Sequence, residues 1–160
     1  RHGTDDSEQW ARWENPALAR NIGNRGPWVS PGEYVVTVEA NGDHGTTHVA
    51  VRGDPAMPIS QAMYISREQF MLDAMALTAE IQTFSQANGI GGGGRGRGGG
   101  MPTTPQEKVQ AAGRLVQQVY QALNGGQVRP GTLYPPTQTQ RGQVLEARRL
   151  FDEAQSELGR

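Results

Sequence analysis

The sequence of 160 residues contains no cysteine. This absence excludes disulfide bonds, thiolate metal sites and cysteine nucleophiles, and it leaves the redox compartment undecided. No apolar run approaches the roughly 18–20 residues that a membrane-spanning helix needs. The 15 basic and 16 acidic residues give a net charge of −1, which argues against nucleic-acid binding as the main role. The chain begins with arginine and carries no signal peptide, so we expect it to be a piece of a longer protein.

Residues 26–58 have the clearest β-strand pattern in the sequence. Two segments rich in Tyr, Val and Thr, residues 33–40 and 46–52, flank the turn-forming residues 41–45. The two-residue period of a strand puts apolar side chains on one face of this hairpin: Tyr34, Val36, Val38, Val49 and Val51. A lone hairpin is only marginally stable, so we expect another segment to cover this face.

Residues 1–25 form a polar segment without a sustained hydrophobic period. Its two tryptophans, Trp10 and Trp13, are three residues apart and can lie together on one helical turn. Large aromatic side chains serve mostly as packing area, so we expect both to cover the open face of the hairpin rather than to stack on a ligand.

Residues 59–160 are predicted to form a three-helix unit. Capping boxes beginning at Ser66, Thr104 and Thr137 mark three helix starts. Each start precedes one apolar seam with helical spacing. The seams comprise Phe70, Ala74, Leu77, Ile81 and Phe84; Val109, Ala112, Val116, Val119 and Leu123; and Val144, Ala147, Phe151, Ala154 and Leu158. The glycine-rich loop 89–103 is predicted to be a flexible spacer between the first two helices. The expected fold class is therefore α+β, a small antiparallel β unit followed by three helices.

The candidates for chemistry are few. His44 and His48 with Asp43 could be imagined as metal ligands, but their spacing favours a solvated turn, since a metal needs three or four convergent ligands. Arg95 and Arg97 lie among glycines as in RNA-binding segments, yet only two arginines and no interleaved aromatic favour a plain loop. The carboxylates lie off the apolar seams, and none is paired as acid and base. We therefore predict no catalytic residue, no cofactor site and no metal site.

Residues 26–55 resemble a pattern at the C-terminal end of large secreted bacterial proteins, and the resemblance to that Ig-like plus helical region covers roughly residues 22–160. These are sortilin-like, BNR-repeat β-propeller proteins that are often labelled glycosyl-hydrolase-like, and the hairpin is also similar to the Ig-like module of flagellar hook-capping proteins. The matching residues are Gly26, Pro27, Pro31, Gly32, Tyr34, Val36, Gly42, Val49, Val51, Asp54 and Pro55. Pro136-Thr137 resembles the pair that precedes the last helix in that family. The resemblance implies a partial Ig-like sandwich and a secreted or periplasmic location. The propeller repeats are absent here, so no catalytic residue carries over.

These observations together predict a noncatalytic accessory module that docks onto an upstream β-propeller body or a partner subunit by strand pairing. The residues expected to carry docking are Trp28, Tyr34, Val36, Val38, Val49 and Val51. Unpaired strand edges also predict self-association of the isolated chain. Two alternatives stay open. The chain could belong to a glycoside-hydrolase-like enzyme whose active site lies upstream, or it could bind nucleic acid through Arg95 and Arg97.

Overall fold

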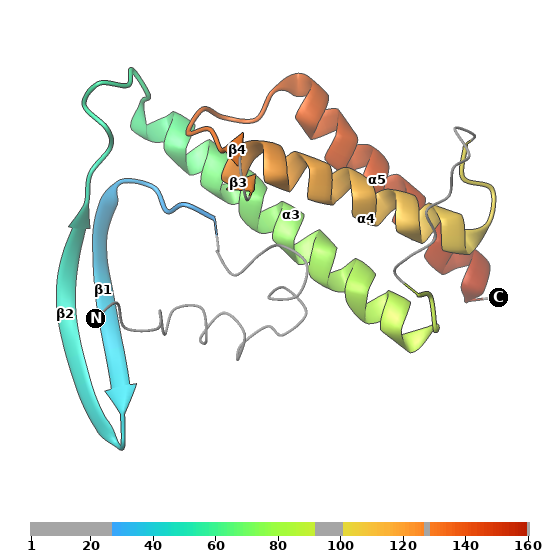
Figure 1. Ribbon diagram of the computed structural model, residues 1–160, viewed down its shortest axis with the longest axis horizontal. Coiled ribbons are helices and arrows are strands. Elements are labelled where there is room, and N and C mark those ends of the chain that lie inside the picture. Colours follow the sequence, from blue (N-terminus) through green and yellow to red (C-terminus); the bar gives the residue numbers. More distant parts are fainter. Residues whose placement is uncertain (1–26, 92–100, 127–128, 160) are drawn as a thin grey trace.

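The computed structural model describes residues 27–91, 101–126 and 129–159 (Figure 1). A β-hairpin projects from one end of a unit of three packed helices, which confirms the predicted α+β fold. The elements in order are β1 (Gly32–Ala40), β2 (Asp43–Val51), α3 (Gln61–Ala87), α4 (Pro105–Asn124), β3 (Gly125–Gly126), β4 (Arg129–Pro130) and α5 (Gln138–Leu158). The predictions for the polar segment 1–25, with Trp10 and Trp13, and for the centre of the glycine-rich loop lie outside the described residues.

The hairpin is tighter than the sequence suggested. β1 and β2 pair antiparallel, and Ala40 opposite Asp43 closes the ladder. Only Asn41 and Gly42 form the turn, with φ angles of 54° and 89°. Positive φ at both central residues characterises the two-residue turn whose twist matches that of a hairpin, and Asn-Gly is its preferred sequence. The predicted turn of five residues was therefore too long, because two residues suffice to reverse the chain.

Helix α3 begins six residues earlier than the capping box at Ser66 predicted. The Ser60 hydroxyl accepts a hydrogen bond from the Met63 amide at 3.3 Å, so Ser60 is the residue that caps the helix. Ser66 lies inside α3, and its hydroxyl accepts a hydrogen bond from the Arg141 guanidinium of α5 at 3.1 Å. The prediction for Ser66 was wrong because a serine with a glutamine three residues later also fits a site that bonds a neighbouring helix.

The other two capping boxes are confirmed. In α4 the Glu107 amide donates to the Thr104 hydroxyl at 3.2 Å, and the Glu107 carboxylate accepts from the Thr104 amide at 3.0 Å. The same reciprocal pair joins Thr137 and Gln140 at the start of α5. These bonds satisfy amides that the first turn of a helix leaves without partners.

The box at Thr104 makes a pH-dependent contribution to stability. Amide hydrogen bonds from Thr104 and Thr103 hold the pKa of Glu107 down to about 2, whereas a glutamate ordinarily has a pKa of 4.5. A depressed pKa in the folded state stabilises the fold above pH 4.5, and that contribution disappears as the pH falls through about 2. We expect Glu107→Gln to flatten this part of the curve of unfolding free energy against pH, measured by urea unfolding. The control is Glu157→Gln, at an exposed carboxylate outside the capping box. This variant should keep the loss of unfolding free energy that Glu107 causes as the pH falls from 4.5 to about 2.

The three predicted seams meet in the core of the helical unit. Every residue of the first two seams is buried or packed against the buried cluster, and Phe84 meets Phe151 edge to face with ring centroids 5.4 Å apart. Leu158 is the exception in the third seam, since it is exposed at the last residue of α5. The core also buries Tyr64, Met71, Ile90, Tyr120 and Leu150, which the seams did not include.

An unpredicted buried arginine joins α3 to the end of α4. Arg67 is only 2% exposed, and its guanidinium donates to the Leu123 carbonyl at 3.0 Å and to the Thr132 carbonyl at 2.8 Å. The Leu123 carbonyl lies in the last turn of α4, where carbonyls lack partners within the helix. The same chain reversal is close-packed, because a Cβ on Gly131 would lie 2.4 Å from the Leu123 carbonyl oxygen. Arg67 therefore holds this reversal against α3.

Candidate docking surface

The foot of the hairpin is attached to the first turns of α3. The Ser30 amide donates to the Glu68 carboxylate at 3.1 Å, and the Gln61 side-chain amide donates to the Pro31 carbonyl at 2.7 Å. The Tyr34 hydroxyl donates to the Ser30 carbonyl at 2.6 Å, which ties β1 to the same segment. The other leg of the hairpin also meets α3.

That second contact is between Gly53 and Tyr64. A Cβ on Gly53 would lie 3.2 Å from the Tyr64 hydroxyl oxygen and 3.3 Å from a carbon of its ring. Glycine therefore permits the chain leaving β2 to pass close to the buried ring of Tyr64. With both legs held, the hairpin has a defined direction relative to the helices.

We expect Glu68→Ala to loosen this junction without unfolding the helices. The change removes the acceptor of the Ser30 amide, and a polar group left without a partner in a partly buried site costs about 1–3 kcal/mol. Amide exchange should accelerate at Ser30 while the core amide of Val116 stays protected. Asp73→Ala, at an exposed carboxylate of the same helix, is the control. Unchanged exchange at Ser30 would show that Glu68 does not hold the junction.

The hairpin places the predicted apolar side chains on one face. The observed register sets Tyr34 opposite Val49 and Gly32 opposite Val51, so Val36 and Val38 share their face. Trp28, in the segment before β1, is 58% exposed, and Val36 and Val38 are 41% and 60% exposed. Val49 is exposed too, whereas Tyr34 and Val51 are half-buried near the foot. The described helices therefore leave most of the apolar face open, and its docking role stays a prediction.

The opposite face of the hairpin carries most of its polar residues, both hairpin histidines, and Val35 and Ala50. His44 and Glu39 are cross-strand neighbours, with Nδ1 and Oε2 3.9 Å apart. Asp43 is one residue from His44 and so points to the other face, away from both histidines. Within residues 27–91, 101–126 and 129–159 no three His, Cys, Asp or Glu side chains are grouped so that they could hold a metal ion.

Each edge of the hairpin exposes the backbone amides and carbonyls of a different set of residues. In a hairpin with a two-residue turn, the pair beside the turn exchanges both backbone hydrogen bonds, and bonded and non-bonded pairs then alternate. Residues of the non-bonded pairs point their amides and carbonyls outward. These residues are Glu33, Val35, Thr37 and Glu39 on β1, and His44, Thr46, His48 and Ala50 on β2.

Several carboxylates of the helical unit form surface ion pairs. Arg148 of α5 bonds Glu80 of α3 at 2.5 Å, and this hydrogen bond lowers the pKa of Glu80. Lys108 of α4 lies 3.2 Å from Glu153 and also bonds Glu157. These contacts join neighbouring helices at partly exposed positions, where each pair contributes little stability.

Comparison with known protein families, characterised proteins and solved structures gives no match for this chain. Among the described residues, no helix is both long and apolar enough to cross a membrane. The surface built above therefore carries the functional argument.

Proposed function

We propose that this chain is a noncatalytic docking module whose hairpin accepts a strand from a partner. The observation that carries the proposal is a hairpin of two nine-residue strands that is anchored at its foot and unpaired along its edges in the described chain, with an apolar face that the described helices leave open. Addition of a strand to an exposed edge takes affinity from backbone hydrogen bonds and specificity from alternate side chains. The alternate side chains that would contact the partner are the apolar ones of Trp28, Tyr34, Val36, Val38, Val49 and Val51.

The edge of β2 is better suited to this role than the edge of β1. Glu33 and Glu39 point their backbone groups outward on β1, and charged residues along an edge discourage pairing. The outward residues of β2 carry no acidic side chain. In the view of Figure 1, β2 also lies on the side of the hairpin farther from the helices. A partner strand at this edge would place its apolar side chains beside Val49 and Val51.

The resemblance to secreted β-propeller proteins supports the choice of partner. We propose strands of an upstream propeller body, or of another subunit, in a secreted or periplasmic assembly. No contact among the described residues favours the hydrolase alternative over docking. Arg95 and Arg97, on which the RNA-binding alternative depends, lie outside the described residues.

Amide exchange on a monomeric sample of the 160-residue chain tests the open edge. The outward amides of Thr46 and His48 should exchange rapidly, whereas the inward amides of Thr47 and Val49 should be protected. Strong protection of all four amides in a monomer would mean that the chain itself pairs this edge, and the proposal would fail.

Self-association supplies a second prediction for the same edge. Proline is tolerated at an outward position of an edge strand but removes the donor that a third strand needs. We expect the chain to self-associate at high concentration, and Thr46→Pro to shift sedimentation to the monomer while the helical far-ultraviolet signal is kept. Thr37→Pro, at an outward position of β1, is the matched control and should self-associate like the parent chain. Equal behaviour of the two variants would contradict the choice of β2.

A further inference from the structure

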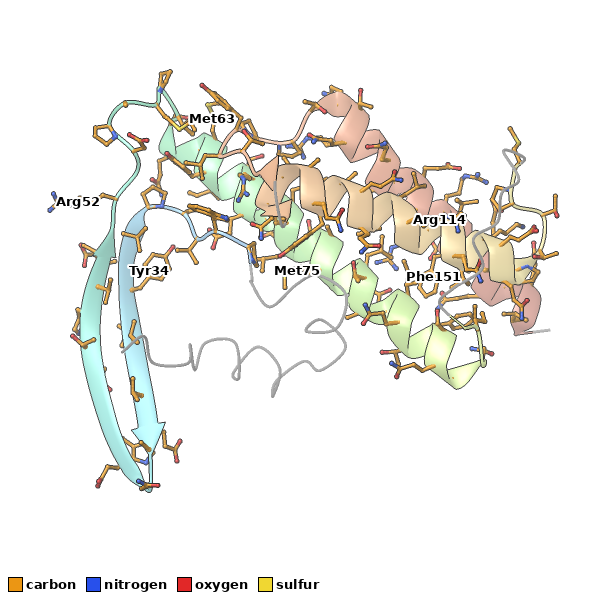
Figure 2. The ribbon with its side chains drawn as sticks, in the orientation of Figure 1. Tyr34, Arg52, Met63, Met75, Arg114 and Phe151 are labelled. Atoms are coloured by element: carbon orange, nitrogen blue, oxygen red, sulfur yellow. The ribbon has the colours of Figure 1, made fainter. Side chains whose placement is uncertain are left out.

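One side of α3 and the apolar face of the hairpin meet at an angle. Glu68 and Gln61 bond the segment that leads into β1, so this side of α3 faces that segment. Leu72 and Met75 lie about one and two turns further along the same side. Tyr34 bonds back to Ser30 and lies on the helix side of β1 in Figure 2. The hairpin face that contains Tyr34 therefore turns toward α3.

Several side chains at this angle are apolar and exposed to solvent. Trp28 and Val29 lie at its corner and are both exposed, Val36 continues along the hairpin, and Leu72 of α3 is 46% exposed. Large exposed apolar patches are uncommon on monomers and mark surfaces that interact with another apolar group.

We propose that residues 1–26 of the same chain occupy this angle and that Trp10 and Trp13 cover the apolar face. The chain enters at Pro27, beside the corner formed by Trp28 and Val29. Residues 14–26 separate Trp13 from Pro27, and an extended chain spans up to about 3.5 Å per residue. That reach of roughly 45 Å exceeds the length of about 30 Å of a nine-residue strand. Each tryptophan brings enough apolar area to cover several valines.

This proposal goes beyond strand addition, because it concerns the face of the hairpin and not its edge. A third strand at β2 would extend the sheet under the same tryptophans, so strand addition at the edge and cover of the face can occur together. A second copy of the chain and an external partner are the rival occupants of the angle.

The absence of cysteine makes the proposal directly testable. A bimane label on a single introduced cysteine is quenched by a tryptophan in contact with it. We expect Val36→Cys-bimane to brighten severalfold when Trp10→Phe and Trp13→Phe are added, with Trp28 kept throughout. Val35→Cys-bimane is the matched control, because Val35 is 61% exposed on the opposite face of the same strand. Its brightness should not change.

Dilution separates the rival occupants. Labelled chain is mixed with an excess of unlabelled chain that carries Trp10→Phe and Trp13→Phe. Quenching that survives the mixture supports residues 1–26 of the same molecule, whereas quenching that is lost assigns the angle to a second copy. No brightening at Val36, or equal brightening at Val35, overturns the proposal. Val49→Cys-bimane repeats the measurement from β2 in case the change at Val36 disturbs the hairpin, and both labelled positions must agree.

Discussion

Phe151→Asp is expected to unfold the helical unit under conditions in which the parent chain is folded. Phe151 is fully buried at the contact of the three helices and packs edge to face on Phe84. A carboxylate there would be buried without a partner and would leave a cavity, so the loss of unfolding free energy should exceed about 4 kcal/mol. The loss of helical signal on heating, followed by circular dichroism, measures the effect.

Val116→Asp and Leu77→Asp should behave in the same way, because both residues lie in the same buried cluster. Gln118→Asp is the control, since Gln118 is exposed on α4, only two residues from Val116. Its expected effect is within about 0.5 kcal/mol. Equal and small effects for all four variants would contradict the packing of the seams.

Replacing Arg67 should have the second largest effect. Arg67→Met keeps most of the apolar stem but removes both donors, so the Thr132 carbonyl loses the bond from Arg67 and the Leu123 carbonyl keeps only the bond from the Thr132 amide. An unpaired buried acceptor costs about 1–3 kcal/mol, and the second bond to a charged donor is lost as well, so we expect a total loss of about 3 kcal/mol in chemical unfolding. Amide exchange should accelerate first at Thr132, whose own amide bonds the Leu123 carbonyl.

The guanidinium geometry explains why lysine should not rescue this site. Arginine presents several donors in a fixed planar fork, whereas the lysine ammonium is a single compact centre. Arg67→Met lowers the unfolding free energy, and Arg67→Lys should therefore recover less than half of that loss. Arg114→Met, at an exposed arginine of α4, should be nearly neutral. Full rescue by lysine would mean that charge rather than the two directed bonds holds the chain reversal.

Burial also shifts the pKa values of Arg67 and Tyr120. Burial lowers the pKa of Arg67, and burial raises the pKa of Tyr120 to about 12. At neutral pH the arginine therefore stays charged and the tyrosine neutral. This charge is compensated by carbonyl dipoles, which include the negative end of α4. The site is thus a structural tie that fixes α4 on the helix to which the hairpin is attached.

The attachment of the hairpin links the proposed docking edge to the helical unit. Glu68, which holds Ser30, is the next residue after Arg67 on α3. One turn of α3 therefore contacts both the foot of the hairpin and the end of α4. A partner strand at β2 would consequently position the whole helical unit, and loosening of the junction by Glu68→Ala should weaken that positioning.

The local patterns in the sequence determined most of the elements. The Asn-Gly pair and the alternation of apolar residues specified the hairpin and its apolar face, because side chains alternate strictly along a strand. The seams and two capping boxes specified α4 and α5, because their signals lie within a few turns of one chain segment. The start of α3 was misplaced at Ser66, since a hydroxyl can cap its own helix or bond another one.

Only the tertiary structure decided how these elements meet. The bond from Ser30 to Glu68 joins residues 38 apart in the sequence, and that from Arg67 to Thr132 joins residues 65 apart. Neither contact has a local signal, because an arginine or a glutamate inside a helix most often faces water. The exposure of the apolar face was equally undetermined. The alternation predicts which side chains share a face, whereas the direction of the hairpin, set at its foot, decides that the described helices leave that face open.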